Sequence, residues 1–407
     1  MKTVLISAYA LSPGRGSEPG MGWSWCSRIA ASCQVHIITE PEFRDEIEQA
    51  LPGFKYADRM HIHYIPVTPR VRTMCRNQGD WRFYWYYRKW QKKAYRLAVE
   101  ICAREQIDVI HQLNMVGFRE PGFLWKIPGV RYVWGPIGGM TMTPISYFRR
   151  EPLKERLKMR IKNLLNSLQI HHSIRVRKAV ERADAIICAT GAEQNVVQNY
   201  FGKPAVVLSE TGLFESPYVG SGRKESSGFN LLWVGRFLRS KELGLALETV
   251  SRLTIPGVRL HVVGTGSEKE VAQYHSLADN LGLSGKIVWH GQVSRDEVQR
   301  MMAQEADLFF FTSVYEATSS VVLEAISNHL PVVCFDACGF GPIVDETVGR
   351  KISLTTPEQS VRDFSAVIES LYADPELRRR LSGQCAEKVR QLSWDGKMAR
   401  LMQMYEA

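Results

Sequence analysis

The chain has 407 residues, more than one hydrophobic core usually supports, which predicts two domains. Its composition, 45% hydrophobic and 23% charged, is that of a folded protein and excludes the disordered, collagen-like and repeat classes. The formal net charge is +10 and is unevenly placed: residues 70–96 and 148–178 carry +8 each, which leaves −6 for the remainder.

No apolar run approaches the length of a membrane span, and we expect the first one to be a buried strand rather than an export signal. Without export, the eight scattered cysteines are expected to be reduced thiols. Neither they nor the ten histidines show metal-ligand spacing, so we predict no metal site.

Short apolar runs alternate with longer amphipathic segments along the chain, a pattern typical of βαβ units with parallel strands. We expect strands at residues 4–8, 35–39, 61–66, 109–112, 131–134, 185–189, 205–208, 231–235, 259–264, 287–290, 308–311 and 332–335. Residues 215–229 are rich in Ser, Gly and charge without periodicity, which predicts a linker. The fold class is therefore α/β, with two tandem Rossmann-like, doubly wound domains at 1–214 and 230–392.

The first loop with chemical potential is glycine-rich. Residues 14–20 read GRGSEPG after the first strand, where glycines such as Gly16 let backbone N–H groups approach an anion. The spacing departs from the GxGxxG of dinucleotide sites, and a flexible turn is the alternative.

Two loops of the C-terminal half carry the next signals. Arg236 and Lys241 follow the strand at 231–235, where two cations can clamp a diphosphate; solvated surface charges are the alternative. Gly264 and Gly266 follow the next strand and could admit a flat base or a phosphate.

The most informative segment is 307–328, an apolar strand that leads through a polar turn into a helix. Thr318, Ser319 and Ser320 are natural N-cap residues, and the free N–H groups of a helix start favour a phosphate. Glu316 stands in the turn, where it would lie near a sugar. Glu324 lies two helical turns further on and could hold a ribose diol through its two acceptor oxygens.

These motifs, with the terminal Ser393-Trp394-Asp395, resemble the retaining, metal-independent glycosyltransferases of the GT-B fold, specifically family 4. The resemblance implies that the C-terminal domain binds a nucleotide-sugar donor, that the N-terminal domain binds the acceptor, and that residues 393–407 form a helix crossing back to the N-terminal domain. It assigns Arg236 and Lys241 to the diphosphate, Glu324 to the ribose and Glu316 to sugar hydroxyls. Donor contacts are also expected at Gly16, Gly264, Gly266 and the 317–320 turn.

Several positions depart from the family pattern. The chain has Glu-Ala-Thr-Ser at 316–319 where the family usually has EGFG, and Glu242 follows the lysine in place of glycine. Many members carry HxH after the fourth strand, whereas this chain offers one histidine, His111. We assign it to the sugar, with a packed structural histidine as the alternative. Gly138 and Gly139, in WGPIGG, are predicted to border the acceptor, with a simple loop as the alternative.

The two basic stretches predict an interaction surface. Residues 81–90 read WRFYWYYRKW, and aromatics with cations fit anionic lipid headgroups. Single-stranded nucleic acid is a weaker alternative, and a plain basic face is another. The second stretch has helical apolar spacing and would also fit a solvated helix.

The sequence therefore predicts a cytoplasmic glycosyltransferase at the inner face of the cell membrane, with no cofactor and no nucleic-acid partner. It would move a sugar from UDP or GDP to a lipid-linked or polysaccharide acceptor in bacterial envelope or exopolysaccharide biosynthesis, with retention of configuration. The alternatives are an inverting transferase or epimerase, and a non-catalytic nucleotide-sugar-binding scaffold.

Overall fold

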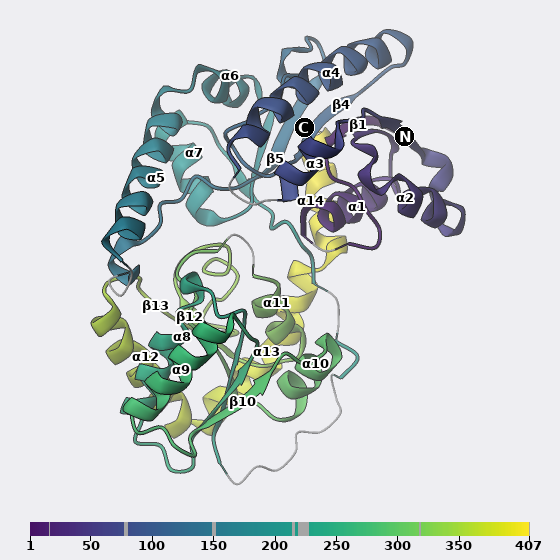
Figure 1. The fold of residues 1–407 in the computed structure, drawn as a ribbon. Coiled ribbons are helices and arrows are strands. Elements are labelled where there is room, and N and C mark those ends of the chain that lie inside the picture. Colours follow the sequence, from purple (N-terminus) through teal and green to yellow (C-terminus); the bar gives the residue numbers. More distant parts are fainter. Residues whose placement is uncertain are drawn as a thin grey trace. The chain divides into compact units, whose positions relative to one another are not determined.

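The computed structural model describes residues 1–15, 17–76, 80–148, 152–213, 216–218, 228–316 and 319–406. The chain divides into two compact units (Figure 1). Unit 1 comprises Met1–Thr141, Asn166–Thr211 and Met398–Ala407, and unit 2 comprises Met142–Leu165 and Gly212–Lys397. Residues 142–165, which the sequence analysis placed in the N-terminal domain, thus belong to unit 2. Most of the predicted linker at 215–229 lies outside the described residues.

Unit 1 is built on a seven-stranded parallel sheet of order β3-β2-β1-β4-β5-β6-β7. Its strands are β1 (Thr3–Ala8), β2 (Gln34–Thr39), β3 (Met60–Tyr64), β4 (Val109–Asn114), β5 (Arg131–Ile137), β6 (Ala185–Cys188) and β7 (Val206–Val207). β4 is buried along its whole length because helices cover both faces of the sheet.

The helices of unit 1 lie in the connections between its strands. They are α1 (Ser17–Ile29), α2 (Arg44–Ala50), α3 (Pro69–Arg76), α4 (Arg82–Arg104), α6 (Ile174–Arg182) and α7 (Gly191–Phe201). The connections through α1 and α2 run toward β3, and those through α4, α6 and α7 run toward β7. Right-handed crossovers in opposite directions place these two sets on opposite faces. Two further helices are shared with unit 2, α5 (Leu153–His172) and α14 (Trp394–Glu406).

Unit 2 repeats this plan with a six-stranded parallel sheet of order β10-β9-β8-β11-β12-β13. Its strands are β8 (Asn230–Val234), β9 (Arg259–Val263), β10 (Ile287–Gly291), β11 (Leu308–Phe311), β12 (Val332–Phe335) and β13 (Gly349–Ile352). Its helices are α8 (Leu243–Arg252), α9 (Glu268–Asn280), α10 (Arg295–Gln304), α11 (Ser320–Ser327), α12 (Pro357–Ala373) and α13 (Pro375–Leu392). α8 packs against α9 and α12, and α11 packs against α10 and α13.

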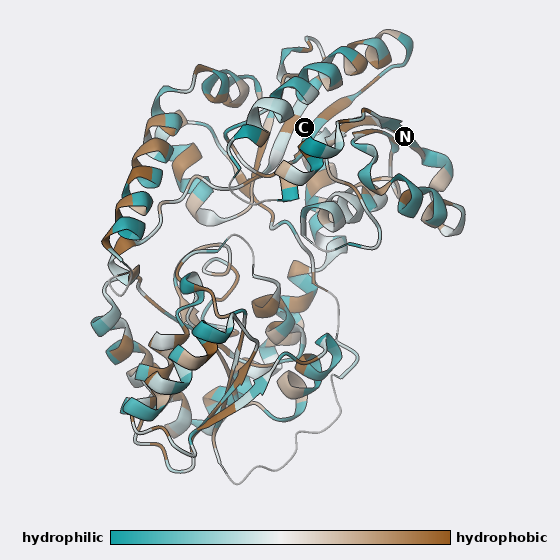
Figure 2. Ribbon diagram, in the orientation of Figure 1, coloured by the Kyte–Doolittle hydropathy of each residue, from teal (hydrophilic) through white to brown (hydrophobic). Residues whose placement is uncertain are grey.

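Each unit has its own hydrophobic core of strand side chains and inward helix faces. Figure 2 shows the hydrophobic strands inside each unit. In unit 2 the phenylalanines of the central strand β11 are fully buried in this core. In the described part of the chain, no helix combines the length and apolarity that a membrane crossing requires.

The fold prediction is confirmed: two tandem units with parallel, doubly wound sheets. All twelve predicted strands overlap observed ones. The sequence analysis missed β13, because this edge strand reads GRKI and lacks the apolar run that marked the others.

Candidate active site

The candidate site lies at the topological switch point of the unit 2 sheet, where the order in which the chain adds strands reverses. β8 and β11 are neighbours in the sheet, and the chain proceeds outward from them to β9 and β10 on one side and to β12 and β13 on the other. Open parallel sheets bind ligands outside the carboxyl ends of their strands at such a switch point. Arg236 follows β8 and Glu316 follows β11, so both predicted residues lie at this edge.

Lys241 and Glu316 form an ion pair at this edge. Lys241 Nζ donates to Glu316 Oε1 at 2.7 Å, and the two side chains are 13% and 23% exposed. The ammonium also lies 4.9 Å from the ring centroid of Phe311, a second favourable contact for a partly buried cation. The sequence analysis assigned Lys241 to a diphosphate and Glu316 to a sugar, and the structure brings these two side chains into direct contact.

The glycine turns after β8 and β9 touch through their backbones. Gly264 has φ +135°, and a Cβ added to it would lie 1.9 Å from the carbonyl oxygen of Gly235. A Cβ on Gly266 would lie 2.8 Å from Glu270 Oε2. These positions exclude any side chain, which explains the glycines that the sequence analysis singled out. Arg236, one residue after Gly235, is exposed to solvent.

The amino end of α11 supplies the third part of the site. Ser319 is its N-cap residue and is 2% exposed, but its side chain makes no capping bond. Within the described residues, Ser319 Oγ and Glu316 Oε2 are both buried without a hydrogen-bond partner. Ser320 begins the helix, whose first N–H groups have no intrahelical acceptor and favour an anion. Thr318 and Ala317 lie outside the described residues.

Glu324 points from α11 toward α10. Its Oε1 accepts from Arg295 Nη2 at 2.8 Å, and the two side chains are 15% and 78% exposed. Burial raises the pKa of Glu324, and hydrogen bonds with Arg295 and Gln299 oppose this rise. The carboxylate is thus held by groups from the neighbouring helix, in the half-buried position expected of a residue that accepts hydroxyl hydrogen bonds.

Sequence reasoning missed three neighbours of the site: Phe311 beside Lys241, Cys338, whose Sγ accepts from the Glu316 backbone N–H at 3.3 Å, and Arg295. Arg295 had one local signal, since it opens α10 directly after the capping Ser294. Its contact with Glu324 joins two helices and has no signature in the sequence.

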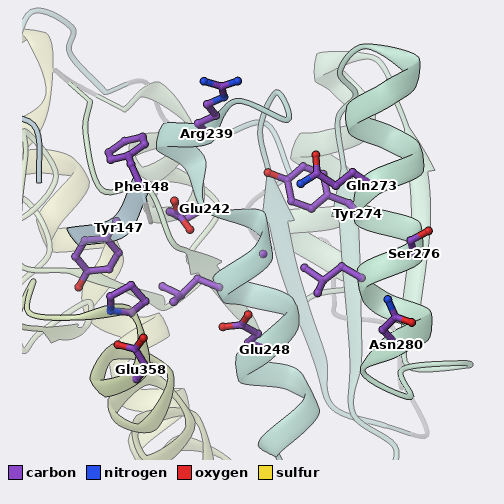
Figure 3. Close-up of a pocket in the computed structure, with 14 residues that line it drawn as sticks. Tyr147, Phe148, Arg239, Glu242, Glu248, Gln273, Tyr274, Ser276, Asn280 and Glu358 are labelled. Atoms are coloured by element: carbon purple, nitrogen blue, oxygen red, sulfur yellow. The ribbon is translucent and has the colours of Figure 1, made fainter. Parts of the chain in front are cut away.

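A separate cavity of about 510 Å³ lies elsewhere in unit 2, among α8, α9 and α12 (Figure 3). Tyr147 and Tyr274 contribute aromatic walls, and Glu242, Glu248 and Glu358 contribute carboxyl groups. None of the predicted site residues lines it, so it is not part of the candidate active site.

His111 does not take part in a site in this structure. It is fully buried in unit 1, with Nδ1 2.7 Å from the Tyr405 hydroxyl and Nε2 2.7 Å from the Gly135 carbonyl oxygen. A carbonyl only accepts, so Nε2 carries the proton and Nδ1 accepts from Tyr405. Burial lowers the pKa of His111 to about 4. Both ring nitrogens already have hydrogen-bond partners. This is the packed, structural role that was the alternative to sugar binding.

The predicted acceptor-side glycines lie after β5 of unit 1. Gly138 exchanges backbone hydrogen bonds with Val116 and Phe118, and a Cβ on it would lie 2.9 Å from a Val116 methyl group. Gly139 has φ +81°, and its N–H, with that of Met140, hydrogen-bonds to the buried carboxyl group of Glu193. The two glycines thus form an anchored loop. Gly16, predicted to contact the donor, lies outside the described residues.

In the part of the chain that the structure describes, no group of three or more His, Cys, Asp and Glu side chains is arranged to hold a metal ion. The positive charges of the site are Lys241 and Arg236, together with the amino end of α11.

Comparison with known proteins identifies this half of the chain. The family model described as glycosyl transferases group 1 matches residues 220–388. All the site residues of unit 2 named above fall inside this matched region.

Curated relatives of the group 1 domain carry glycosyltransferase names. The alpha-D-kanosaminyltransferase of Streptomyces kanamyceticus is 26% identical over 223 residues, which are 52% of this chain and 56% of that protein. The lipopolysaccharide glucosyltransferase WaaG of Escherichia coli K12 is 31% identical over 137 residues, 33% of this chain and 35% of that protein. The chain thus matches little more than half the length of the first relative.

Solved structures resemble this chain over its whole length, across both units. The Anabaena protein Alr3699/HepE, crystallised in complex with UDP, covers all of this chain and is itself covered in full, with a TM-score of 0.61 at 14% identity. At this identity the likeness shows the fold alone.

Proposed function

We propose that this chain is a glycosyltransferase that transfers a sugar from a nucleoside-diphosphate donor, bound in unit 2, to an acceptor hydroxyl. The observation that carries the proposal is the Lys241–Glu316 ion pair at the switch point of the unit 2 sheet, next to the amino end of α11. A donor has a diphosphate joined to a sugar. Its site therefore needs cations for the diphosphate beside groups that accept hydrogen bonds from the sugar hydroxyls.

The leaving diphosphate gains negative charge as the sugar departs. Lys241, Arg236 and the first N–H groups of α11 stabilise that charge from fixed positions, which lowers the barrier. Because these groups supply positive charge, we propose that the reaction needs no metal ion. Loss of one charged contact costs on the order of 100-fold in rate.

The sugar and the ribose have separate partners. Glu316 Oε2 and Ser319 Oγ are buried and without hydrogen-bond partners among the described residues, and sugar hydroxyls would satisfy them. Glu324 accepts from the ribose diol while Arg295 balances its charge. We propose UDP or GDP as the nucleotide, and retention of configuration as in the family that the sequence resembles. The crystallised UDP complex of the Anabaena relative favours UDP.

The acceptor proposed is a lipid-linked or polysaccharide glycan of a bacterial envelope, with the enzyme at the cytoplasmic face of the membrane. The relative named for lipopolysaccharide synthesis supports this class. On α5, six aliphatic side chains at helical spacing are 46% to 79% exposed: Leu153, Leu157, Ile161, Leu164, Leu165 and Leu168. Basic residues lie between them, and Trp81 and Trp85 beside α4's start are exposed too. Such helices bind anionic lipid surfaces.

The test of the donor site is thermal unfolding of the purified chain in EDTA with UDP, GDP, ADP or NAD⁺. A nucleotide at 100 times its Kd stabilises the fold by about 2.7 kcal/mol, a readable shift. Arg236→Ala is expected to abolish the shift. Arg259→Ala is the matched control, because Arg259 is exposed at the amino end of β9, at the opposite edge of the same sheet.

A shift with UDP or GDP that Arg236→Ala removes and Arg259→Ala keeps supports the donor site and identifies the nucleotide. A shift with NAD⁺ alone, or none with any nucleotide, contradicts the proposed function.

A further inference from the structure

Unit 1 contains a cavity of about 740 Å³ at the switch point of its own sheet. β1 and β4 are neighbours in this sheet, and the chain proceeds outward from them to β2 and β3 on one side and to β5, β6 and β7 on the other. The cavity is lined by residues that directly follow β1, β2 and β4: Tyr9 and Ala10, Glu40, and Met115. The cavity of unit 1 therefore lies at the position where open α/β sheets bind ligands.

Glu18, in the first turn of α1, lines this cavity. Its Oε1 accepts from the Val116 backbone N–H at 3.1 Å, which fixes the carboxyl group. Its Oε2 is buried and has no hydrogen-bond partner within the described part of the chain. A buried carboxyl oxygen without a partner costs stability, and such a cost is retained where a ligand supplies the partner. Burial also raises the pKa of Glu18 to about 7.

The charges on the cavity wall favour a neutral ligand. Glu40 and Glu42 are the other carboxylates, and Arg15 and Arg76 are the two guanidinium groups. Each guanidinium already has a carboxylate partner: Arg15 Nη2 lies 2.7 Å from Glu46 Oε1, and Arg76 bonds to Glu42. Glu40 and Glu42 are likewise paired, with Arg72 and Arg76, whereas Glu18 Oε2 has no partner among the described residues. An anionic ligand would therefore have to compete for the paired cations, whereas a hydroxyl group of a neutral ligand can donate to Glu18.

We propose that this cavity binds an uncharged, polyhydroxylated acceptor terminus, and that Glu18 Oε2 accepts a hydrogen bond from one of its hydroxyl groups. The cavity thereby selects a neutral glycosyl terminus over a phosphorylated one. This inference rests on the proposed glycosyltransferase function and names the class of its acceptor. The volume lies within the range of small-molecule sites.

The experiment is saturation-transfer NMR with four probes at matched concentration. Three are neutral, the methyl α-pyranosides of glucose, mannose and galactose, and one is anionic, glucose 6-phosphate. The proteins are the unmodified chain, Glu18→Gln, Glu18→Ala, Glu316→Gln and the control Glu48→Gln. Glu48 is a half-exposed carboxylate of α2, ion-paired to Arg44, and does not line the cavity.

We expect at least one neutral glycoside to bind the unmodified chain and to bind more strongly than glucose 6-phosphate. Its affinity should fall about tenfold in both Glu18 variants, the effect of losing or weakening one buried hydrogen bond. Glu48→Gln should leave it unchanged.

Four results would overturn the inference: no glycoside binds, the phosphorylated sugar binds as strongly, the Glu18 variants bind normally, or Glu316→Gln alone removes binding, which would place the glycoside in the donor site. If the Glu18 variants do not fold, the comparison of neutral and phosphorylated probes on the unmodified chain still decides the ligand class. The UDP- or GDP-induced thermal shift is measured on the same samples. Its presence with failed glycoside binding refutes the acceptor inference alone, and its absence refutes the proposed function.

Discussion

Lys241 and Glu316, which follow the two central strands of the unit 2 sheet and lie 75 residues apart in sequence, are joined by a 2.7 Å ion pair. The pair is largely buried, so each side chain holds the other in one orientation before any ligand binds. A site with its charges already oriented spends less binding free energy on ordering side chains. The ion pair therefore preorganises the point where diphosphate and sugar would meet.

Replacing Lys241 with Ala should weaken binding of UDP or GDP about tenfold to 100-fold, because a charge-assisted contact to the diphosphate is lost. The same substitution should weaken binding of UMP or GMP less, because these nucleotides lack the second phosphate. Isothermal titration of both nucleotides measures the difference, with Lys286→Ala at the amino end of β10 as the control. Equal losses for the mono- and diphosphate would argue against a diphosphate contact.

Gly264→Ala should destabilise unit 2 severely. Its Cβ would lie 1.9 Å from the Gly235 carbonyl oxygen, and φ +135° is strained for any side chain. We expect a loss of about 3 kcal/mol or more. Gly282→Ala is the matched control, because Gly282 also has positive φ but has nothing within 4 Å of a Cβ, so about 1 kcal/mol is expected. Urea unfolding compares the two, and similar losses would refute the close backbone approach.

Glu18 should make the stability of unit 1 depend on pH. Its pKa is about 7 in the folded chain and 4.5 ordinarily, so between these values the folded state keeps a proton that the unfolded chain has released. Stability then falls as pH rises through this window and levels off above it. Glu18→Gln should remove this slope, worth up to about 3 kcal/mol. Urea unfolding from about pH 5 to 8 checks it; parallel profiles of variant and parent would contradict it.

The exposed face of α5 should bind anionic lipid. Leu157→Asp with Leu164→Asp is expected to reduce co-flotation with vesicles of phosphatidylglycerol and phosphatidylcholine severalfold, because two inserted side chains become charged. Binding of the parent should fall on vesicles of phosphatidylcholine alone. Val99→Asp, a comparably exposed position of α4, is the control. If the double variant floats normally but changes from dimer to monomer in light scattering, the face is an interface between copies of the chain.

The fold was predictable from sequence because most strands, above all the buried central ones such as β1, β8 and β11, read as short apolar runs, and all twelve predicted runs overlap strands. The site of unit 2 was predictable for a related reason: polar residues directly after a buried strand lie at the carboxyl edge of the sheet. The sequence assigned Lys241 to a diphosphate and Glu316 to a sugar, and it did not predict the direct contact between them.

Other features depend on contacts that the sequence does not encode locally. His111 lies within β4 rather than after it, and its ring nitrogens are bonded to Gly135 and to Tyr405, which is 294 residues away. Glu18 belongs to the glycine-rich segment 14–20, but nothing in that segment marks it as a site residue. Its fixed orientation comes from the distant Val116 N–H, and its raised pKa comes from burial. Local pattern indicates where chemistry can occur, and long-range packing decides which side chains remain able to perform it.

Unit 1 consists of three separate stretches of chain, the last beginning at Met398. Lys2 Nζ donates to the Tyr405 carbonyl oxygen at 2.8 Å, so the residue directly before β1 contacts the last helix. During synthesis on the ribosome, all seven strands of unit 1 emerge before residue 214, but His111 gains its Tyr405 partner only after residue 405 has been added. Unit 2, although encoded later, can therefore complete its core first. A fragment that stops at residue 214 would be an incomplete domain.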